Sequence, residues 1–496
     1  MTAHERPDGP RPDEHRVDDS RTGEHRADEY RPDGHRADRT PPPPPPPPFR
    51  PAEWRARAEA AAGTALARVT GTALGPYQAA VVRIGFAATW LLFLLRELPH
   101  RRELYGPESP WGWELAERLN DANEAFSVLM WTESGVWFEC VYALAVLASA
   151  ALLLGWRTRT MSVLFMVGVL SLQNRSIFMG DGGDNVIHLM SIYLVLTRCG
   201  RVWSLDARRA ARTAPAASAA SGPPAAPDAP AAALVSRDVT GVVLWTLAAL
   251  ALAVATFGPG LTAGWALVFW GLWAVQGLWW LVCRRAPGEP RAVCDIVANL
   301  VHNGTMVVIM AEVCFIYATA GWYKIQGSRW QDGTAAYYPM KLDYFAPWPA
   351  LNDLFVGNGL MIMIMTYGTV IVQVAFPFTL FNRRVKNVLL FVMIVEHLSI
   401  AVLLGLPFFS LAMIAADAVF LPTVLLVWLG ARASGLAGRL RRGTGFGARG
   451  EGVPAGDAGA GSGAAEEADA DTGAAPAVPH GRAPVPAPTA ERAPRD

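Results

Sequence analysis

The chain has 496 residues and a formal net charge of zero, and 52% of its residues are hydrophobic. The hydrophobic residues lie in long runs in the middle of the chain, whereas both ends are polar. This composition favours a membrane protein whose partner is the lipid bilayer, and we expect no nucleic-acid partner. The five cysteines are odd in number and lack CxxC spacing, so we expect neither a disulfide framework nor a metal site.

The first 74 residues are predicted to form a disordered cytoplasmic tail. They contain loose repeats of the type EHRxD/RPDxH and then a run of prolines from Pro41 to Pro48, without periodic apolar positions. The histidines of these repeats could bind a metal, but a solvated arm of mixed charge explains them more simply. The first apolar run starts near Tyr77, behind the polar arm, so we expect no cleavable signal peptide.

The apolar runs predict an all-α, polytopic membrane protein with about ten transmembrane helices. A helix needs about 20 apolar residues to cross ~30 Å of hydrocarbon. The expected spans lie near 77–95, 136–154, 160–173, 186–198, 239–257, 262–283, 298–320, 358–380, 386–404 and 407–430. The third and fourth are short, and they are tilted, partly re-entrant or longer than these ranges.

Composition divides the membrane part into two blocks. The first block covers residues 75–209 and the second covers residues 237–431, and an Ala/Pro-rich linker at 210–236 separates them. The remaining residues, 432–496, are rich in Ala, Gly, Pro and acidic residues and are predicted to form a second disordered cytoplasmic tail.

Arginine-rich loops predict the orientation of the spans. The segments GWRTRT, TRCGRVWSLDARRAAR, CRRAPGEPRA, FNRRVKN and GRLRRG all fall on one side if there are ten spans. Positively charged loops face the cytoplasm, so both termini are expected there. Arg-rich, Lys-poor usage suggests a bacterial source and hence the cell membrane. The glycine-rich and aromatic segments then gather on the outer face.

Ionisable residues inside apolar runs are candidate functional residues. Each costs at least ~2.5 kcal/mol there, so it normally faces other helices and has a partner. They are Arg83, His188, His302, Glu312, Glu396, His397 and Asp417. Depth along the helices predicts that four side chains converge in one cavity of the outer leaflet: Lys324, His397, His188 and Glu312.

Each of these residues also has a structural interpretation. Arg83, Glu312 and Asp417 can be ion-pair partners, and His188 can be a hydrogen-bonded packing residue. Glu396 and its neighbour point about 100° apart, so at most one of the two is expected to face a given site squarely.

The segment GDGGDN is similar in composition to a calcium loop. It lacks the alternating ligand spacing and the closing Glu of an EF-hand. A glycine-rich outer turn in which Asp181 caps the following helix is the favoured interpretation.

The segment YATAGWYKIQGSRWQDGTAAYY contains Lys324, one of three lysines in a chain with forty arginines. An amine beside an apolar slot can lose its charge and act as a base, which a guanidinium cannot do near neutral pH. Trp322, Tyr323 and Trp330 suit the bilayer interface and can also stack on a flat hydrophobic ligand. The alternative is a lysine that snorkels within an aromatic belt.

This segment resembles the signature of the HTTM family, the membrane domain shared with vitamin K-dependent gamma-carboxylase. Other motifs occur in the same order: an arginine in the first span (VVRIGF), the segment NRSIFMGDGGDNVIHL followed by SLDA, and EHLSIAVLLGLPFF. The matching residues are Arg83, Asn174, Gly180, Asp181, Asp206, His397, Gly405 and Phe408. The resemblance covers about 75–430, interrupted by the linker and by an apparently extra hairpin at 239–283.

The resemblance implies a quinol-binding site. In the carboxylase, the lysine of this motif deprotonates reduced vitamin K, and the resulting anion reacts with oxygen to give a strong base. This base removes a proton from a glutamate side chain, and CO2 adds to the carbanion. Carried over, Lys324 would be the catalytic base and His397 a supporting catalytic group. The other site residues would bind a menaquinone- or vitamin K-type quinol: Trp322, Tyr323, Trp330, His188, Glu312, Arg83 and Asp181.

The chain also departs from the carboxylase. The large lumenal domain that helps to bind the protein substrate has no counterpart after the last span. Carboxylation of a protein glutamate therefore does not follow, and three functions compete. They are a carboxylase/lyase- or quinol-oxidase-like membrane enzyme, a transporter or lipid-binding protein without catalysis, and a scaffold whose tails bind an unknown protein partner.

Overall fold

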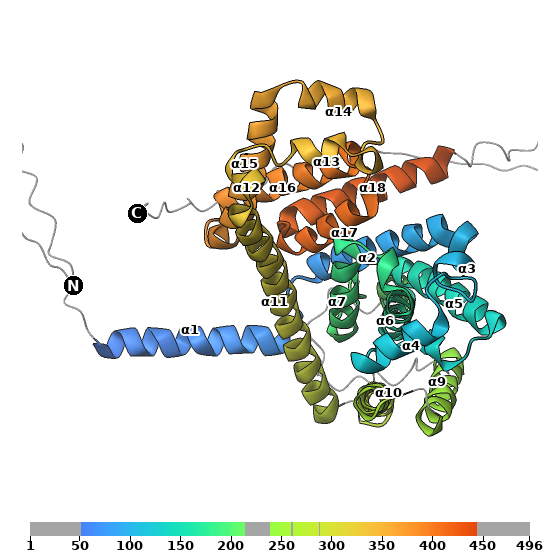
Figure 1. The fold of residues 1–496 in the computed structure, drawn as a ribbon. Coiled ribbons are helices and arrows are strands. Elements are labelled where there is room, and N and C mark those ends of the chain that lie inside the picture. Colours follow the sequence, from blue (N-terminus) through green and yellow to red (C-terminus); the bar gives the residue numbers. More distant parts are fainter. Residues whose placement is uncertain (1–50, 214–238, 259–260, 287, 444–496) are drawn as a thin grey trace, which may run out of the picture. The chain divides into compact units, whose positions relative to one another are not determined.

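The computed structural model describes residues 51–213, 239–258, 261–286 and 288–443. Within these residues the secondary structure is helical and contains no strand, as predicted for an all-α protein. The α-helices in chain order are α1 (Pro51–Gly71), α2 (Pro76–Glu97), α3 (Arg101–Leu104), α4 (Trp113–Ala122), α5 (Gly135–Leu154), α6 (Thr158–Arg175), α7 (Gly182–Leu196), α8 (Leu205–Thr213), α9 (Val239–Phe257), α10 (Ala263–Arg285), α11 (Glu289–Gln326), α12 (Ser328–Gln331), α13 (Tyr337–Lys341), α14 (Pro349–Val356), α15 (Gly359–Ala375), α16 (Arg383–Leu403), α17 (Pro407–Asp417) and α18 (Thr423–Gly443) (Figure 1).

Six short 3-10 segments occur between these helices in the described ranges. They are η1 (Leu98–His100), η2 (Val128–Trp131), η3 (Ile177–Met179), η4 (Asp343–Phe345), η5 (Phe376–Thr379) and η6 (Ala418–Phe420). Contacts divide the chain into two compact units. Among the described residues, one unit contains those within 51–74 and 278–303, and the other contains those within 75–277 and 304–443.

In the first unit, polar residues of α11 bind the carboxyl end of α1. The side-chain amide of Asn303 donates to the carbonyls of Val69 and Thr72, and that of Asn299 donates to the carbonyl of Thr70. A ring nitrogen of His302 lies 2.9 Å from the carbonyl oxygen of Leu74. These bonds satisfy carbonyls that a helix end leaves unpaired. His302 therefore has a structural role as a capping residue.

In the second unit, the core lies where α2, α5, α6, α7, α16 and α17 pack together. Glycines allow the closest approaches. A Cβ atom on Gly85 of α2 would lie 2.5 Å from the Cβ atom of Ala415 in α17, and one on Gly168 of α6 would lie 2.9 Å from that of Ala145 in α5. Real Cβ atoms do not approach so closely, so these glycines set the distances between the helices.

The number of helices that can cross a membrane is smaller than predicted. Seven described helices are long and apolar enough to span a bilayer, or eight if the bent pair Pro407–Phe420 and Thr423–Gly435 is one span. Several apolar helices of this kind are compatible with a multi-pass membrane protein. The prediction of about ten spans is not confirmed, and the difference lies in three places.

Two of these places are α6 and α7, the short third and fourth expected spans. With 15 residues, α7 extends only ~22 Å at 1.5 Å per residue, which is less than the hydrocarbon thickness. In α6, Arg159, Gln173 and Arg175 lower the hydropathy of an 18-residue helix. The third place is the tenth expected span, which is bent by 116° where Leu421 and Pro422 separate its two parts.

The predicted tails and linker are only partly covered. The ranges 1–50, 214–238 and 444–496, on which most of these predictions fall, lie outside the described residues. Within the first expected tail, however, Pro51–Gly71 is a helix, and α18 continues to Gly443 into the second. The helix Pro51–Gly71 and the part of α18 beyond residue 430 were not predicted, because their apolar residues do not form a continuous run.

Candidate functional site

Lys324, near the end of α11, lines a cavity of about 540 Å³ that we call the Lys324 cavity. Residues of α15 and α16 form two of its walls. Its remaining walls come from the α12–α13 segment and from Phe409 at the start of α17. Most lining side chains are apolar, and a few polar groups lie among them, as is common in sites for small hydrophobic molecules.

One hydrogen-bonded chain at this cavity starts at the lysine. The Nζ atom of Lys324 donates to the side-chain oxygen of Gln373 at 2.6 Å, and the amide nitrogen of Gln373 donates to Glu396 at 2.7 Å. Nζ also lies 5.3 Å from the centre of the Trp330 ring. Among the described residues Lys324 has no ion-pair partner within 4.0 Å. An amide oxygen can accept a hydrogen bond from a neutral amine as well as from an ammonium group, so this contact does not require a charged lysine.

A glycine in the lysine motif makes this chain possible. A Cβ atom on Gly321 would lie 2.5 Å from a side-chain carbon of Val374 in α15. The absence of a side chain therefore lets α11 and α15 approach closely, one helical turn before Lys324 and next to Gln373.

A second hydrogen-bonded chain reaches the same cavity from below its surface. The hydroxyl group of Tyr317 lies 2.9 Å from Nε2 of His397 and 3.0 Å from a carboxylate oxygen of Asp417. All three side chains are buried, and His397 lines the cavity. The expected ion pair of Asp417 is not formed within the described residues, because its partner is the Tyr317 hydroxyl.

The structure brings together only part of the predicted site. Lys324, Trp330 and His397 line one cavity. Trp322 and Tyr323 are 63% and 74% exposed on the outside of α11 and do not line it, which suits an interfacial aromatic belt and not stacking on a ligand. Trp322 and Tyr323 precede Lys324 by two positions and one position, and residues at such spacings point to different faces of a helix, so they do not face the cavity with Lys324.

The two acidic candidates behave differently from the expectation. Glu312 is half-buried and is not among the residues that line the Lys324 cavity, so the predicted convergence is wrong for this side chain. In contrast, both Glu396 and His397 line the cavity, although at most one was expected to face it. The cavity is wide enough to touch two adjacent faces of α16.

Arg83 is fully buried in α2 but has a structural role. Its guanidinium donates to the carbonyls of Leu152 and Leu153, at the end of α5, and to the carbonyl of Trp203. These groups would otherwise be unpaired at the helix end. The arginine therefore holds α2 against α5, and it is not among the residues that line the Lys324 cavity.

His188 and Asp181 line a separate polar cavity of about 180 Å³. A ring nitrogen of His188 lies 2.9 Å from the side-chain oxygen of Gln173. Asp181 forms a capping box with Asp184 at the start of α7, as its predicted capping role requires. Burial raises the pKa of Asp184 to about 6. The predicted convergence of His188 with Lys324 in one cavity is therefore wrong.

Two residues of the site were not named as candidates from the sequence. Tyr317 lies seven positions before Lys324, which places both on the same face of a helix, and it begins the lysine motif. Gln373 is a single strongly polar residue in an apolar run, and such a residue normally faces other helices. Both signals were present, but neither one identifies the partner residue.

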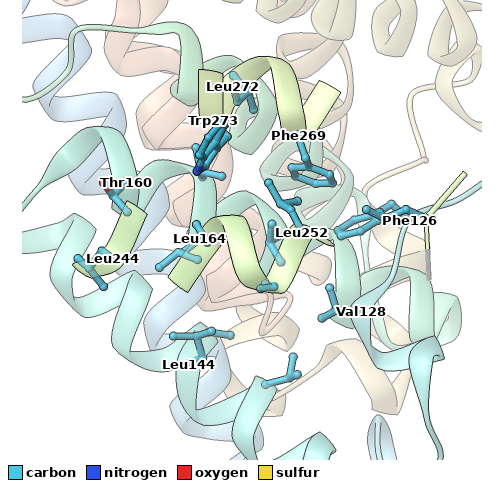
Figure 2. A pocket seen from close by; sticks show the side chains of 18 of the residues that line it. Phe126, Val128, Leu144, Thr160, Leu164, Leu244, Leu252, Phe269, Leu272 and Trp273 are labelled. Atoms are coloured by element: carbon cyan, nitrogen blue, oxygen red, sulfur yellow. The ribbon is translucent and has the colours of Figure 1, made fainter. Parts of the chain in front are cut away.

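A third cavity, of about 260 Å³, is lined almost entirely by apolar side chains, and we call it the tryptophan cavity. Figure 2 shows Leu144 of α5 and Leu164 of α6 together with Leu252 of α9 and Trp273 of α10 around a common space. The walls come from α5, α6, α9, α10 and the loop before α5. The helices α9 and α10 form the hairpin that interrupts the motif resemblance.

The polar atoms at the tryptophan cavity bind one another. The indole nitrogens of Trp245 and Trp273 each donate to the backbone carbonyl of the other residue, and Gln276 donates to the hydroxyl of Thr160. The stacked rings of the two tryptophans lie 4.0 Å apart. Because these donors are satisfied, this cavity suits hydrocarbon and offers little for chemistry.

Comparison of the chain with protein-family models, with curated proteins and with solved structures found no match.

Proposed function

We propose that this chain is a multi-pass membrane protein of the HTTM type whose Lys324 cavity binds a reduced quinol of the menaquinone or vitamin K class, with Lys324 as the base. The observation that carries the proposal is a lysine at the wall of a largely apolar 540 Å³ cavity, bonded to a neutral amide and without an ion-pair partner among the described residues. The order of the sequence motifs supports the same interpretation.

The chemistry asked of Lys324 is one proton transfer. The O–H bond of a quinol hydroxyl breaks, its proton forms a new N–H bond on the neutral amine, and the quinol is left as an anion. The apolar walls would hold the ring and chain of such a molecule. Oxygen then takes two electrons from the quinol anion, and the two quinol protons, one of them released by Lys324, complete hydrogen peroxide and leave the quinone and a neutral amine.

The proposal places the lysine motif on the outer face of the cell membrane and both termini in the cytoplasm. The arginine-rich loops support this placement. If α6 and α7 do not cross the membrane, the chain makes two fewer crossings. Two crossings return the chain to the same side, so every later loop stays on the side of the membrane that was predicted for it. With the bent pair counted as one span there are eight, an even number.

The test compares two lysines in the purified full-length protein in lipid nanodiscs. Menadiol, a soluble quinol, is added, and its binding without oxygen and its oxidation with oxygen are measured. We expect Lys324→Arg to lower the oxidation rate about 100-fold or more, because a guanidinium cannot take the proton. The matched control is Lys341→Arg, which changes an exposed lysine paired with Asp353.

Two results of this comparison would contradict the proposal. Quinol oxidation that continues at the same rate in Lys324→Arg, or that falls equally in Lys341→Arg, rules out Lys324 as the base. Thermal unfolding of both variants is measured in parallel, so that a folding defect is recognised.

A transporter or lipid-binding protein without catalysis is the second candidate. The bend of 116° between α17 and α18 favours it, because transporters build their central sites from broken helices. Flux of a labelled quinol into proteoliposomes that depends on the protein and persists in Lys324→Arg would support this function over the enzyme.

A further inference from the structure

The second hydrogen-bonded chain of the Lys324 cavity has three members from three helices. Tyr317 of α11 stands between His397 of α16 and Asp417 of α17, with distances of 2.9 Å to Nε2 and 3.0 Å to Oδ2. The exposed fractions are 1% for Tyr317, 2% for His397 and 0% for Asp417. Among the three, only His397 lines the cavity, so it is the point at which a ligand meets the chain.

With Asp417 taken as an ionised carboxylate, the donors and acceptors of this chain assign its protons. Tyr317 has one hydroxyl hydrogen and donates it to the carboxylate of Asp417. Its oxygen must then accept the hydrogen of Nε2 of His397, since both contacts are hydrogen bonds. The neutral imidazole has one ring hydrogen, so its other nitrogen, Nδ1, carries a free lone pair.

Two buried acceptors at the ends of the chain have no partner among the described residues. These are Nδ1 of His397 and Oδ1 of Asp417. Leaving a buried polar atom unpaired costs roughly 1–3 kcal/mol, so such atoms commonly mark places where a ligand or water completes the structure. Because His397 lines the cavity, a ligand that brings an O–H or N–H group and displaces the packing around Nδ1 would pair this acceptor.

We propose that Asp417, Tyr317 and His397 form a second proton acceptor of the Lys324 cavity, which carries a proton from a ligand hydroxyl to the buried carboxylate. This inference rests on the proposed binding of a quinol. A quinol gives up two protons when it becomes a quinone, and Lys324 takes one of them. The relay takes the proton of the second hydroxyl when the quinol binds, before oxidation, and gives it up to the reduced oxygen when O2 has taken the electrons.

The transfer balances in atoms and charge. The ligand O–H bond breaks and an N–H bond forms at Nδ1 of His397, while Nε2 releases its hydrogen to the oxygen of Tyr317. Tyr317 releases its own hydrogen to Asp417. The imidazole and the phenol end neutral, the carboxylate has become a carboxylic acid, and the ligand oxygen carries the negative charge.

The relay is separate from the chain that begins at Lys324. That chain continues through Gln373 to Glu396, and no hydrogen bond between the two chains is found within the described residues. Substitutions can therefore interrupt one chain and leave the other in place. Tyr317 and Asp417 touch no ligand and act through His397, so they are positioning residues in this scheme.

The test is infrared difference spectroscopy of the full-length protein in nanodiscs on addition of menadiol without oxygen. We expect the C=O stretch of a newly protonated carboxylic acid in the wild type, and its loss in Asp417→Asn and in Tyr317→Phe. With oxygen admitted, we expect Tyr317→Phe to oxidise bound menadiol about 100-fold more slowly, the size of a typical acid–base contribution. A residue with only a packing role would not move either readout.

The matched control is Tyr367→Phe, which removes another tyrosine hydroxyl whose partner is the carbonyl of Gln331. We expect it to keep both the band and the rate. The relay is overturned if the band survives in Asp417→Asn or in Tyr317→Phe, or if Tyr317→Phe oxidises menadiol at the wild-type rate. If the wild type binds menadiol and depends on Lys324 but shows no band, the relay alone fails. Absence of menadiol binding by the wild type overturns the proposed function and the relay together.

Discussion

The Lys324 cavity and the tryptophan cavity differ in how their polar atoms are satisfied. At the tryptophan cavity, Gln276 binds Thr160 and the two stacked indoles bind backbone carbonyls, so a ligand would find little but hydrocarbon. At the Lys324 cavity, His397 keeps one nitrogen without a partner among the described residues. Both cavities lie among apolar helices, so an apolar cavity by itself does not indicate a catalytic site. Unsatisfied and titratable groups on the residues that line the cavity are what indicate one.

Filling the Lys324 cavity with a side chain gives the largest expected effect. Gly368 lines the Lys324 cavity, and a Cβ atom on it would have no heavy atom within 4 Å. We expect Gly368→Leu to fold normally and to lower menadiol affinity at least about tenfold, because the new side chain occupies the ligand's space. Equilibrium binding in nanodiscs measures this effect.

The control for this substitution is Gly271→Leu on α10. This glycine also has open space around it and lies outside the Lys324 cavity. It should leave menadiol affinity unchanged. Equal affinity in Gly368→Leu and the wild type would mean that the ligand binds elsewhere.

Replacing one glutamine in each cavity compares the two polar networks directly. Gln373→Leu removes the partner of both Lys324 and Glu396, and we expect a loss of about 2–3 kcal/mol of stability, since hydrogen bonds to ionisable groups are involved. Gln276→Leu removes one bond to a neutral hydroxyl and should cost about 1 kcal/mol. Thermal unfolding of both variants in nanodiscs gives the comparison. A larger loss of stability in Gln276→Leu than in Gln373→Leu would contradict the expectation that the polar network of the Lys324 cavity contributes more to stability.

The smallest effect concerns a residue that the sequence analysis assigned to the quinol site. Asp181 caps α7 by accepting from the backbone nitrogens of Gly183 and Asp184. We expect Asp181→Ala to lower stability by about 1 kcal/mol and to leave menadiol binding unchanged. Calorimetric unfolding and the same binding assay check both parts. Loss of menadiol binding without loss of stability would indicate that Asp181 belongs to the ligand-binding site.

Much of the fold follows from local features of the sequence. The all-helical class and the positions of the longest apolar helices were predicted because a run of about 20 apolar residues is a local signal. The capping role of Asp181 was predicted for the same reason, since a cap depends on residues three positions apart. The short helices α6 and α7 were the weak point, because a buried helix and a membrane span have similar compositions.

The candidate site was predicted in part. Lys324, Trp330 and His397 were named and share a cavity, whereas Trp322 and Tyr323 face outward. Sequence position sets how far along a helix a side chain lies, but not toward which neighbouring helix it points. This is why Glu312 was wrongly expected to join Lys324.

By itself, the sequence determined that the chain is helical, where its apolar helices lie and that a lysine stands near the end of one of them. Only the tertiary structure decided that Tyr317 meets both His397 and Asp417, and that Gln373 joins Lys324 to Glu396. Helix formation depends on neighbours within a few positions along the chain. These contacts join helices far apart in sequence, and close packing of whole helix faces determines which of them meet.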